Sequence, residues 1–218
     1  MKNRKDKAAL GFSIVELLIA MTITLIVLGL AANLFSKSLG TRQRESSRTD
    51  ALTAAQAALN VMSREIANSG YGLTDKDGQY NNGIILGTDS GAEKLHFLSN
   101  VKNDDTVISA PGENITYFFE PVTKSILRYD AHANGLNKPE TSIIINRISK
   151  VEFQYFDYTN GTTTPQPPAT TAPTINTSRI RVKITVTLED VQGQMSKQSV
   201  VLVSDVALRN SKYMLQQY

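Results

Sequence analysis

The sequence predicts an α+β protein in which one long N-terminal helix packs on a mainly antiparallel β-sheet. Two observations lead to this fold class. No proline occurs before Pro111, so one helix can run from about residue 13 to residue 69. After Gly72, apolar and polar residues alternate, which is the period of half-buried strands. A helix followed by a run of strands is typical of the α+β class.

The first part of this helix, residues 12–32, has the composition of a transmembrane segment. The stretch from Leu17 to Ser36 contains 20 residues without a formal charge. A helix of this length spans about 30 Å, which is the thickness of the hydrocarbon layer of a bilayer. Thr22 and Thr24 are compatible with such a segment, because a hydroxyl in a helix can donate to the carbonyl one turn back.

The second part, residues 33–69, is predicted to continue as an amphipathic helix. Gly70 offers a C-cap, and Gly29 and Gly40 are the expected places for bending or local melting. We expect the apolar stripe to pack on the core of its own domain; a surface for a partner is the alternative. The stripe comprises Leu52, Ala55, Leu59, Met62 and Ile66, and the opposite face carries Arg48, Gln56, Asn60 and Arg64.

Residues 70–218 are predicted to form a β-rich globular head. The clearest strand is RIRVKITVTLE, in which Ile180, Val182 and Ile184 alternate with Arg181 and Lys183. The predicted strands are 83–86, 94–99, 106–109, 114–120, 125–129, 142–148, 151–158, 179–188 and 199–208.

A threonine- and proline-rich segment, residues 159–178, interrupts the strand pattern before the last two strands. It contains eight threonines and four prolines. Its apolar content is too low for it to fold alone, so we expect a flexible, exposed loop. A glycosylated or partner-binding loop at the tip of the head is the functional alternative.

The charge distribution argues against a nucleic-acid-binding protein, although the pI is about 9.0. The first 11 residues contain four basic residues and one acidic residue, and this excess equals the net charge of +3 of the whole chain. Everything from Phe12 onward is balanced, so the chain without its first 11 residues would have no net charge to attract a polyanion. The absence of cysteine excludes thiol catalysis, disulfides and cysteine-ligated metals.

The sequence predicts neither catalytic nor cofactor-binding residues. The two histidines, His96 and His132, are expected on the outer face of a strand and in a loop, and neither is expected to bind metal. No G-x-S-x-G or P-loop pattern occurs. The segment DKDGQYNNG, residues 75–83, resembles a calcium loop but has Tyr80 and Leu86 where an EF-hand requires Gly and Glu, so we interpret it as a cluster of turns.

An acid, Glu16, stands near the start of the apolar segment and requires an explanation. A secretory signal peptide with a small-x-small site at 29–31 or a plain signal anchor would each account for the basic start and apolar centre. Both leave Glu16 unexplained beyond its favourable position at a helix N-terminus. The basic residues flanking the segment tie at four on each side, so the positive-inside rule does not set the topology.

The residues around Glu16 match a third pattern. A Lys/Arg-rich leader, residues 1–11, ends in Gly11 and is followed by Phe12, a small polar residue, two aliphatic residues, Glu16 and the apolar run. This arrangement resembles the class III signal of type IV pilins and secretion pseudopilins. The resemblance implies that a prepilin peptidase cuts between Gly11 and Phe12, that the new amino terminus of Phe12 is methylated, and that the apolar helix is retained.

Cleavage after Gly11 would place the amine of Phe12 and the carboxylate of Glu16 about one helical turn apart. In a filament core made of packed helices, both charges would leave water, and buried charges persist when they are paired. A neighbouring helix shifted along the axis could offer its amine to Glu16. Glu16 is thus a candidate assembly residue, which matches the charge-neutralising role that the family resemblance implies.

Two short stretches, residues 63–72 and 204–210, resemble PilW-type minor pilins, with pseudopilin J of type II secretion as a close second. The resemblance implies a non-enzymatic subunit that helps initiate or cap a filament. Its partners would be the prepilin peptidase, the assembly platform of the inner membrane and other major and minor pilins. It would be a single-pass inner-membrane protein with a periplasmic head, and later part of a pilus or pseudopilus. A membrane-anchored periplasmic binding module or enzyme is the alternative.

Overall fold

The structure is a computed structural model, and it describes residues 12–73, 82–102, 108–158, 169–187 and 199–215. A single helix, α1 (Ile14–Ala67), opens the described chain and runs without interruption through Gly29 and Gly40. Neither glycine melts the helix. The helix ends where Gly70 adopts a φ of +79°, the left-handed conformation that the predicted C-cap requires.

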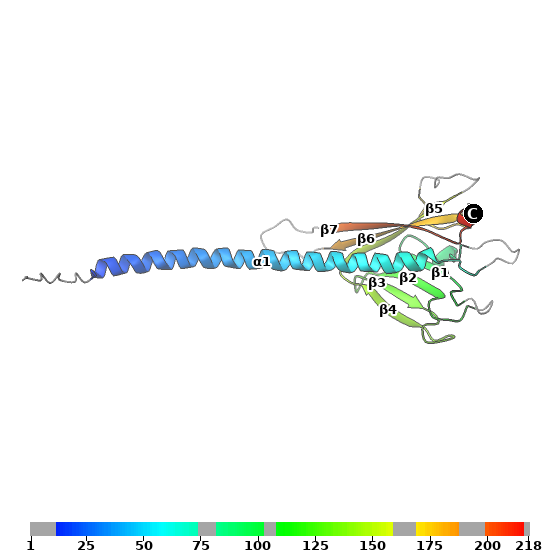
Figure 1. The fold of residues 1–218 in the computed structure, drawn as a ribbon, viewed down its shortest axis with the longest axis horizontal. Helices are drawn as coiled ribbons and strands as arrows, with labels where there is room; N and C mark the ends of the chain where they lie inside the picture. The colour runs from blue at the N-terminus through cyan, green and yellow to red at the C-terminus, as the bar shows by residue number, and fades with distance from the viewer. Residues whose placement is uncertain (1–11, 74–81, 103–107, 159–168, 188–198, 216–218) are drawn as a thin grey trace, which may run out of the picture. The chain divides into compact units, whose positions relative to one another are not determined.

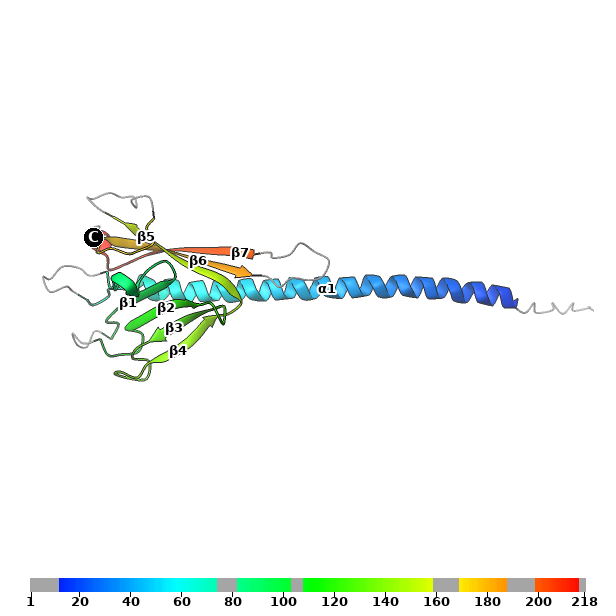
Figure 2. The same ribbon diagram turned by 180° about the vertical axis from the view of Figure 1, so that it is seen from behind.

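The strands form two antiparallel sheets, as Figures 1 and 2 show from opposite sides. In the first sheet, β1 to β4 lie in chain order. The second sheet has the order β5, β6, β7. The α+β prediction is therefore confirmed, with the strands divided over two sheets. The bounds are β1 (Lys94–Leu98), β2 (Asn114–Glu120), β3 (Ser125–Asp130), β4 (Glu140–Ile145), β5 (Ile148–Asp157), β6 (Thr177–Thr187) and β7 (Ser199–Ala207), with a short helix α2 (Lys212–Leu215) near the C-terminus.

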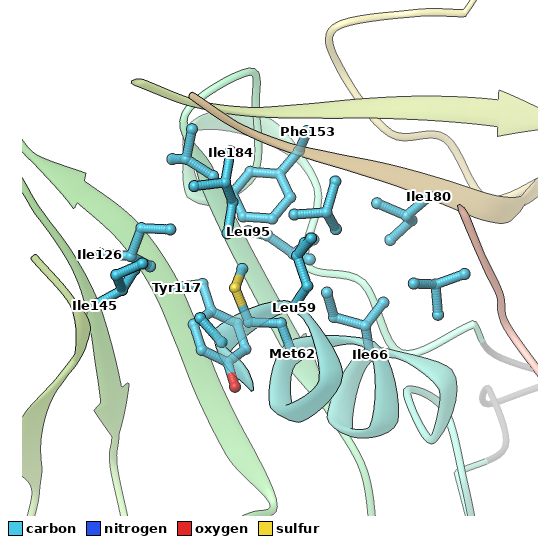
Figure 3. Packing of buried hydrophobic residues seen from close by; sticks show 14 of the residues in the cluster. Leu59, Met62, Ile66, Leu95, Tyr117, Ile126, Ile145, Phe153, Ile180 and Ile184 are labelled. Atoms are coloured by element: carbon cyan, nitrogen blue, oxygen red, sulfur yellow. The ribbon is translucent and has the colours of Figure 1, made fainter. Parts of the chain in front are cut away.

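The chain separates into two compact units, Met1–Ser46 and Ser47–Tyr218. The second unit, the head, therefore contains the C-terminal part of α1 together with both sheets. The hydrophobic core of the head takes residues from all three. Figure 3 shows Leu59, Met62 and Ile66 of α1 pointing toward side chains from both sheets, such as Leu95 and Phe153.

Four of the five residues of the predicted apolar stripe of α1 are confirmed as part of this core, whereas Leu52 is half-buried and lies outside it. Ala55, Leu59, Met62 and Ile66 are buried, whereas Arg48, Gln56, Asn60 and Arg64 on the opposite face are exposed. The inward face of β6 is confirmed as well, since Ile180, Val182, Ile184 and Val186 are all buried.

The segment before β1 joins the two sheets. The carbonyl of Ala92 accepts a hydrogen bond from the N–H of Phe153 in β5, at 2.7 Å, and the carbonyl of Glu93 accepts one from Phe119 in β2, at 3.2 Å. The hydroxyl of Tyr155 adds a bond of 2.8 Å to the carbonyl of Gly91. Three successive residues thereby hold the edges of both sheets together.

Some predicted strands were wrong. Residues 83–86 form only an isolated bridge between Ile84 and Phe97, because Gly83 and Gly87 both have positive φ and leave too few extended residues between them. The predicted strand 142–148 ends at Ile145, and Arg147, with a φ of +59°, turns the chain into β5. Residues 108 and 109 are not in a strand, and the rest of the predicted strand 106–109 lies outside the described residues.

The threonine-rich loop is shorter than predicted. Residues 159–168 lie outside the described residues, but residues 169–178 are held against the head. Thr174 and Thr177 both donate to the carboxylate of Asp157, at 2.7 and 2.8 Å, and β6 already begins at Thr177. Paired hydroxyls on one acid order this part of the segment, which low apolar content alone does not reveal.

Candidate functional site

The candidate site begins where α1 begins. Ser13 precedes the first helical residue, and its Oγ accepts a hydrogen bond from the N–H of Val15 at 3.3 Å while its carbonyl accepts one from Leu17 at 3.1 Å. This is the geometry of an N-cap. Glu16 lies in the first turn of the helix, where a carboxylate is favoured by the helix dipole.

Phe12 and Glu16 are both exposed, with Phe12 outside the helix and 85% exposed. Glu16 has no ion pair with any of the described residues. The other residue of the predicted cleavage site, Gly11, lies outside the described residues. The positions of Phe12 and Glu16 therefore leave both groups available to a molecule other than this chain.

The apolar segment that follows is exposed throughout. Every large apolar side chain from Phe12 to Leu39 has half or more of its surface accessible. Thr22 and Thr24 donate to the carbonyls of Ile19 and Ala20, both at 2.8 Å, as predicted. The helix is long and apolar enough to cross a membrane, and its hydroxyls are already satisfied within the helix.

The two stretches on which the finer resemblance depends, residues 63–72 and 204–210, lie in contact. The hydroxyl oxygens of Ser63 and Ser204 are 2.9 Å apart. The N–H of Arg209 donates to the carbonyl of Ala67 at 3.1 Å, and the side chain of Asn210 donates to the carbonyl of Ser69 at 3.2 Å. These two bonds satisfy carbonyls at the end of α1, which a helix cannot satisfy itself. The C-terminal segment therefore fixes the end of the long helix.

A polar cluster on the other side of this helix was missed by sequence reasoning. The carboxylate of Glu65 accepts hydrogen bonds from the hydroxyl of Tyr117 and from Nε of Arg128, the latter at 3.0 Å. A second nitrogen of Arg128 lies 3.3 Å from Asp130, whose carboxylate is almost fully buried. Arg128 of β3 thus joins the first sheet to α1 through Glu65, and Asp130 of the same strand is its second acidic partner.

The ionisation of the cluster follows from its burial and its neighbours. Burial, together with the nearby Glu65 carboxylate, raises the pKa of the Tyr117 hydroxyl well above its ordinary value, so Tyr117 remains a donor. Burial opposes the charge of Arg128, but the hydrogen bond and the charge of Glu65 outweigh it and raise the pKa of Arg128. One signal in the sequence could have indicated this cluster. Glu65 stands next to Ile66 of the apolar stripe, and a half-buried acid needs a hydrogen-bonding or charged partner.

The structure places the two histidines at separate, structural positions. His96 lies between the buried residues Leu95 and Phe97, and its Nε2 is 2.9 Å from the side-chain oxygen of Asn114. His132 is buried in the turn after β3, where its Nδ1 accepts the N–H of Asn137 at 3.1 Å. Within the described ranges, no group of three acids or histidines could hold a metal ion. Most of the calcium-like segment 75–83 lies outside those ranges.

Comparison with known proteins identifies the N-terminal segment. Residues 6–32 match the family model described as the prokaryotic N-terminal methylation motif. No curated protein matches the chain. The motif is the prepilin signal of type IV pilin-type proteins, and the α+β layout with one long N-terminal apolar helix matches a type IV pilin fold. Together the motif and the apolar helix support a pilin-like protein with a single-pass membrane anchor.

Proposed function

We propose that this chain is a prepilin that becomes a minor pilin or pseudopilin, a subunit that helps to initiate or cap a type IV pilus or related secretion filament. The observation that carries the proposal is the exposed apolar helix with Glu16 in its first turn, directly within the matched methylation motif. In this proposal a prepilin peptidase cuts between Gly11 and Phe12 and the amine of Phe12 is methylated.

The assembly role of Glu16 follows from its surroundings. A single subunit in a membrane can place Glu16 at the interface, where the acid leans toward water or takes a proton. Packed helices in a filament exclude that water, and an unpaired acid there is unfavourable by several kcal/mol. The amine of Phe12 from a neighbouring subunit is the partner that neutralises it, and the pairing fixes the axial shift between two helices.

The exposed half of α1 and the closed core of the head are compatible with a subunit that packs against other pilins through its helix. The exposed half of α1 offers the apolar surface for packing against other pilins, while the head keeps its own core closed by the other half. We place the head in the periplasm before assembly and assign the assembly platform of the inner membrane and other pilins as partners. The sequence resemblance of residues 63–72 and 204–210 is our reason for proposing a PilW-type minor pilin, with pseudopilin J as the alternative.

The mature N-terminus tests the processing step. Mass spectrometry of the chain purified from cells that contain a prepilin peptidase is expected to find N-methylated Phe12. A start at Ala32 would instead indicate a secretory signal peptide. A chain that keeps Met1 or begins at Lys2 would indicate a simple membrane anchor and would contradict the proposal.

The variant Glu16→Ala tests the assembly role. We expect normal cleavage and membrane insertion, with incorporation into filaments lowered by about tenfold or more, because the neighbouring amine loses its partner. Asp50→Ala is the matched control, since Asp50 is an exposed acid of the same helix outside the apolar segment. Sheared filaments are quantified by immunoblot for both variants. Normal incorporation of Glu16→Ala would refute the assembly role of this acid.

A further inference from the structure

Three cations follow the apolar segment of α1 directly. Lys37, Arg42 and Arg44 come after Ser36, the last residue of the uncharged stretch 17–36. These three residues are called the basic collar below. Lys37 and Arg42 are exposed, and Arg44 is half-buried with an Nε that has no hydrogen-bond partner in the described chain. None of the three forms an ion pair with a described residue.

Four cations of the head differ in this respect. Lys94, Arg128, Lys150 and Arg181 each lie within 3.2 Å of a carboxylate oxygen of the same unit. Long basic side chains that carry their charge without an internal partner leave that charge available to a ligand. The basic collar therefore differs from these four head cations by its lack of ion pairs, and from the exposed head cations Arg48 and Arg64 by its position directly after the apolar segment.

The collar is arranged around the helix axis rather than on one face. Seven residues separate Lys37 from Arg44, about two turns, so these two side chains share a side of the helix. Arg42, five residues after Lys37, lies about 140° around the axis. A partner helix or sheet would meet cations on one side only, whereas lipid headgroups surround a membrane helix on all sides.

The height of the collar above the hydrocarbon layer also fits lipid headgroups. With a rise of about 1.5 Å per residue, Arg42 and Arg44 lie about 9 and 12 Å beyond Ser36. The headgroup layer occupies about 5 to 8 Å on each side of the hydrocarbon, and the Debye length is about 8 Å at physiological ionic strength. All three cations are therefore within electrostatic reach of the headgroup phosphates, while Arg48, about 18 Å beyond Ser36, is farther than one Debye length from them.

From these positions we infer that the basic collar binds the phosphate headgroups of anionic phospholipids in the membrane leaflet that faces the head. This inference rests on the proposed membrane-anchored subunit. The lipid contacts hold the subunit at a fixed depth while it waits in the membrane. They must be released when the subunit leaves the bilayer for a filament.

The test uses the mature full-length chain from Phe12 onward in nanodiscs of equimolar phosphatidylcholine and phosphatidylglycerol. Native mass spectrometry measures the ratio of the two lipids that stay bound. We expect phosphatidylglycerol to be enriched in the wild type, and the triple variant Lys37→Gln, Arg42→Gln, Arg44→Gln to lower this enrichment by about tenfold. Arg48→Gln is the matched control and is expected to keep the wild-type ratio. Raising the ionic strength to about 1 M, where the Debye length is about 3 Å, should remove the enrichment.

Three results would overturn the inference: no enrichment in the wild type, full enrichment in the triple variant, or an equal loss in Arg48→Gln.

Protection of the apolar segment from protease in the same nanodiscs separates this inference from the proposed function. A chain that inserts but shows no lipid preference overturns only the collar. A chain that fails to insert overturns the membrane anchor as well. A triple variant with intact lipid preference and lost filament incorporation would assign the cations to a contact between subunits instead.

Discussion

Both halves of α1 are helical, but the first half exposes its large apolar side chains and the second half contributes apolar side chains to the core of the head. Between Ile14 and Ser46 every large apolar side chain is exposed by half or more, and Glu16, in the first turn, has no ion pair with a described residue. Between Ala55 and Ile66 the side chains of Ala55, Ala58, Leu59, Met62 and Ile66 are buried, and the acid in this range, Glu65, accepts hydrogen bonds from two donors.

This difference shows which half of the helix depends on the fold. Apolar surface that is buried in the chain stabilises the head, whereas apolar surface that the chain leaves open stabilises a complex with lipid or with other helices. The two halves should therefore respond differently to the same substitutions, the second in folding and the first in insertion or assembly.

The largest effect is expected from a matched pair of leucines. Leu59→Ala should lower the free energy of unfolding of the head by about 3 kcal/mol, because Leu59 is 1% exposed and its removal leaves a cavity in the core. Leu28→Ala, at a position 59% exposed, should change it by less than about 0.5 kcal/mol. Urea unfolding of the full chain in detergent, followed by near-UV circular dichroism of the tyrosines, measures both. Comparable losses in the two variants would contradict the division of the helix.

The next largest effect on the stability of the head is expected from a comparison of Glu65 with Glu16. Glu65→Gln should lower the stability of the head by about 2 kcal/mol, because Arg128 loses one of its two charged partners in a site where the side chains of Arg128 and Glu65 are three-quarters buried or more. Glu16→Gln removes the same charge from the other half and should leave the unfolding of the head unchanged. The same urea titration compares them.

The neighbouring exposed residue Arg64 controls for a general effect of charge removal near Glu65. Arg64→Gln is expected to stay within about 0.5 kcal/mol of the wild type. A double variant, Glu65→Gln with Arg128→Met, should lose more stability than Glu65→Gln alone, since it also leaves the buried carboxylate of Asp130 without its cation. An unchanged stability of Glu65→Gln would show that the cluster does not hold α1 to the first sheet.

Local patterns in the sequence predicted much of this division. The spacing of Ala55, Leu59, Met62 and Ile66 reports a helical face directly, because the period of a helix is a property of neighbouring residues. The alternation along β6 predicted its buried face for the same reason. The motif from Gly11 to Glu16 is equally local, since it spans six consecutive residues of the sequence.

Contacts between distant residues were not predictable in this way. Glu65 bonds to Tyr117 and Arg128, which are 52 and 63 residues away, and no local period indicates such a pairing. Glu113 is buried and accepts hydrogen bonds from the N–H groups of Lys102, Ser109 and Ala110. The residues beside Glu113 in the sequence do not indicate these contacts. The junction between the two sheets likewise depends on hydrogen bonds of residues 91–93, which no strand pattern indicates.

The smallest expected effect on stability comes from the ion pair between Arg181 and Asp205 in the head. Arg181 donates to both carboxylate oxygens of Asp205 across β6 and β7, at 2.7 and 2.8 Å. This hydrogen bond, with the charge of Arg181, lowers the pKa of Asp205 below its ordinary value of 3.8. A lowered pKa in the folded state gives stability that is present above the unfolded value and is lost as the pH falls through the folded value.

Asp205→Asn should therefore lower the stability of the head by about 0.5 kcal/mol at neutral pH, because both side chains are about a third exposed. The difference from the wild type should vanish in strong acid, where the wild-type carboxylate is also protonated. Thermal unfolding of both proteins across the acid range measures it. Lys37→Gln serves as the comparison from the other region and should leave this pH dependence unchanged, since Lys37 has no acid partner in the described chain. A difference for Asp205→Asn that persisted in strong acid would assign the role of Asp205 to packing instead of charge.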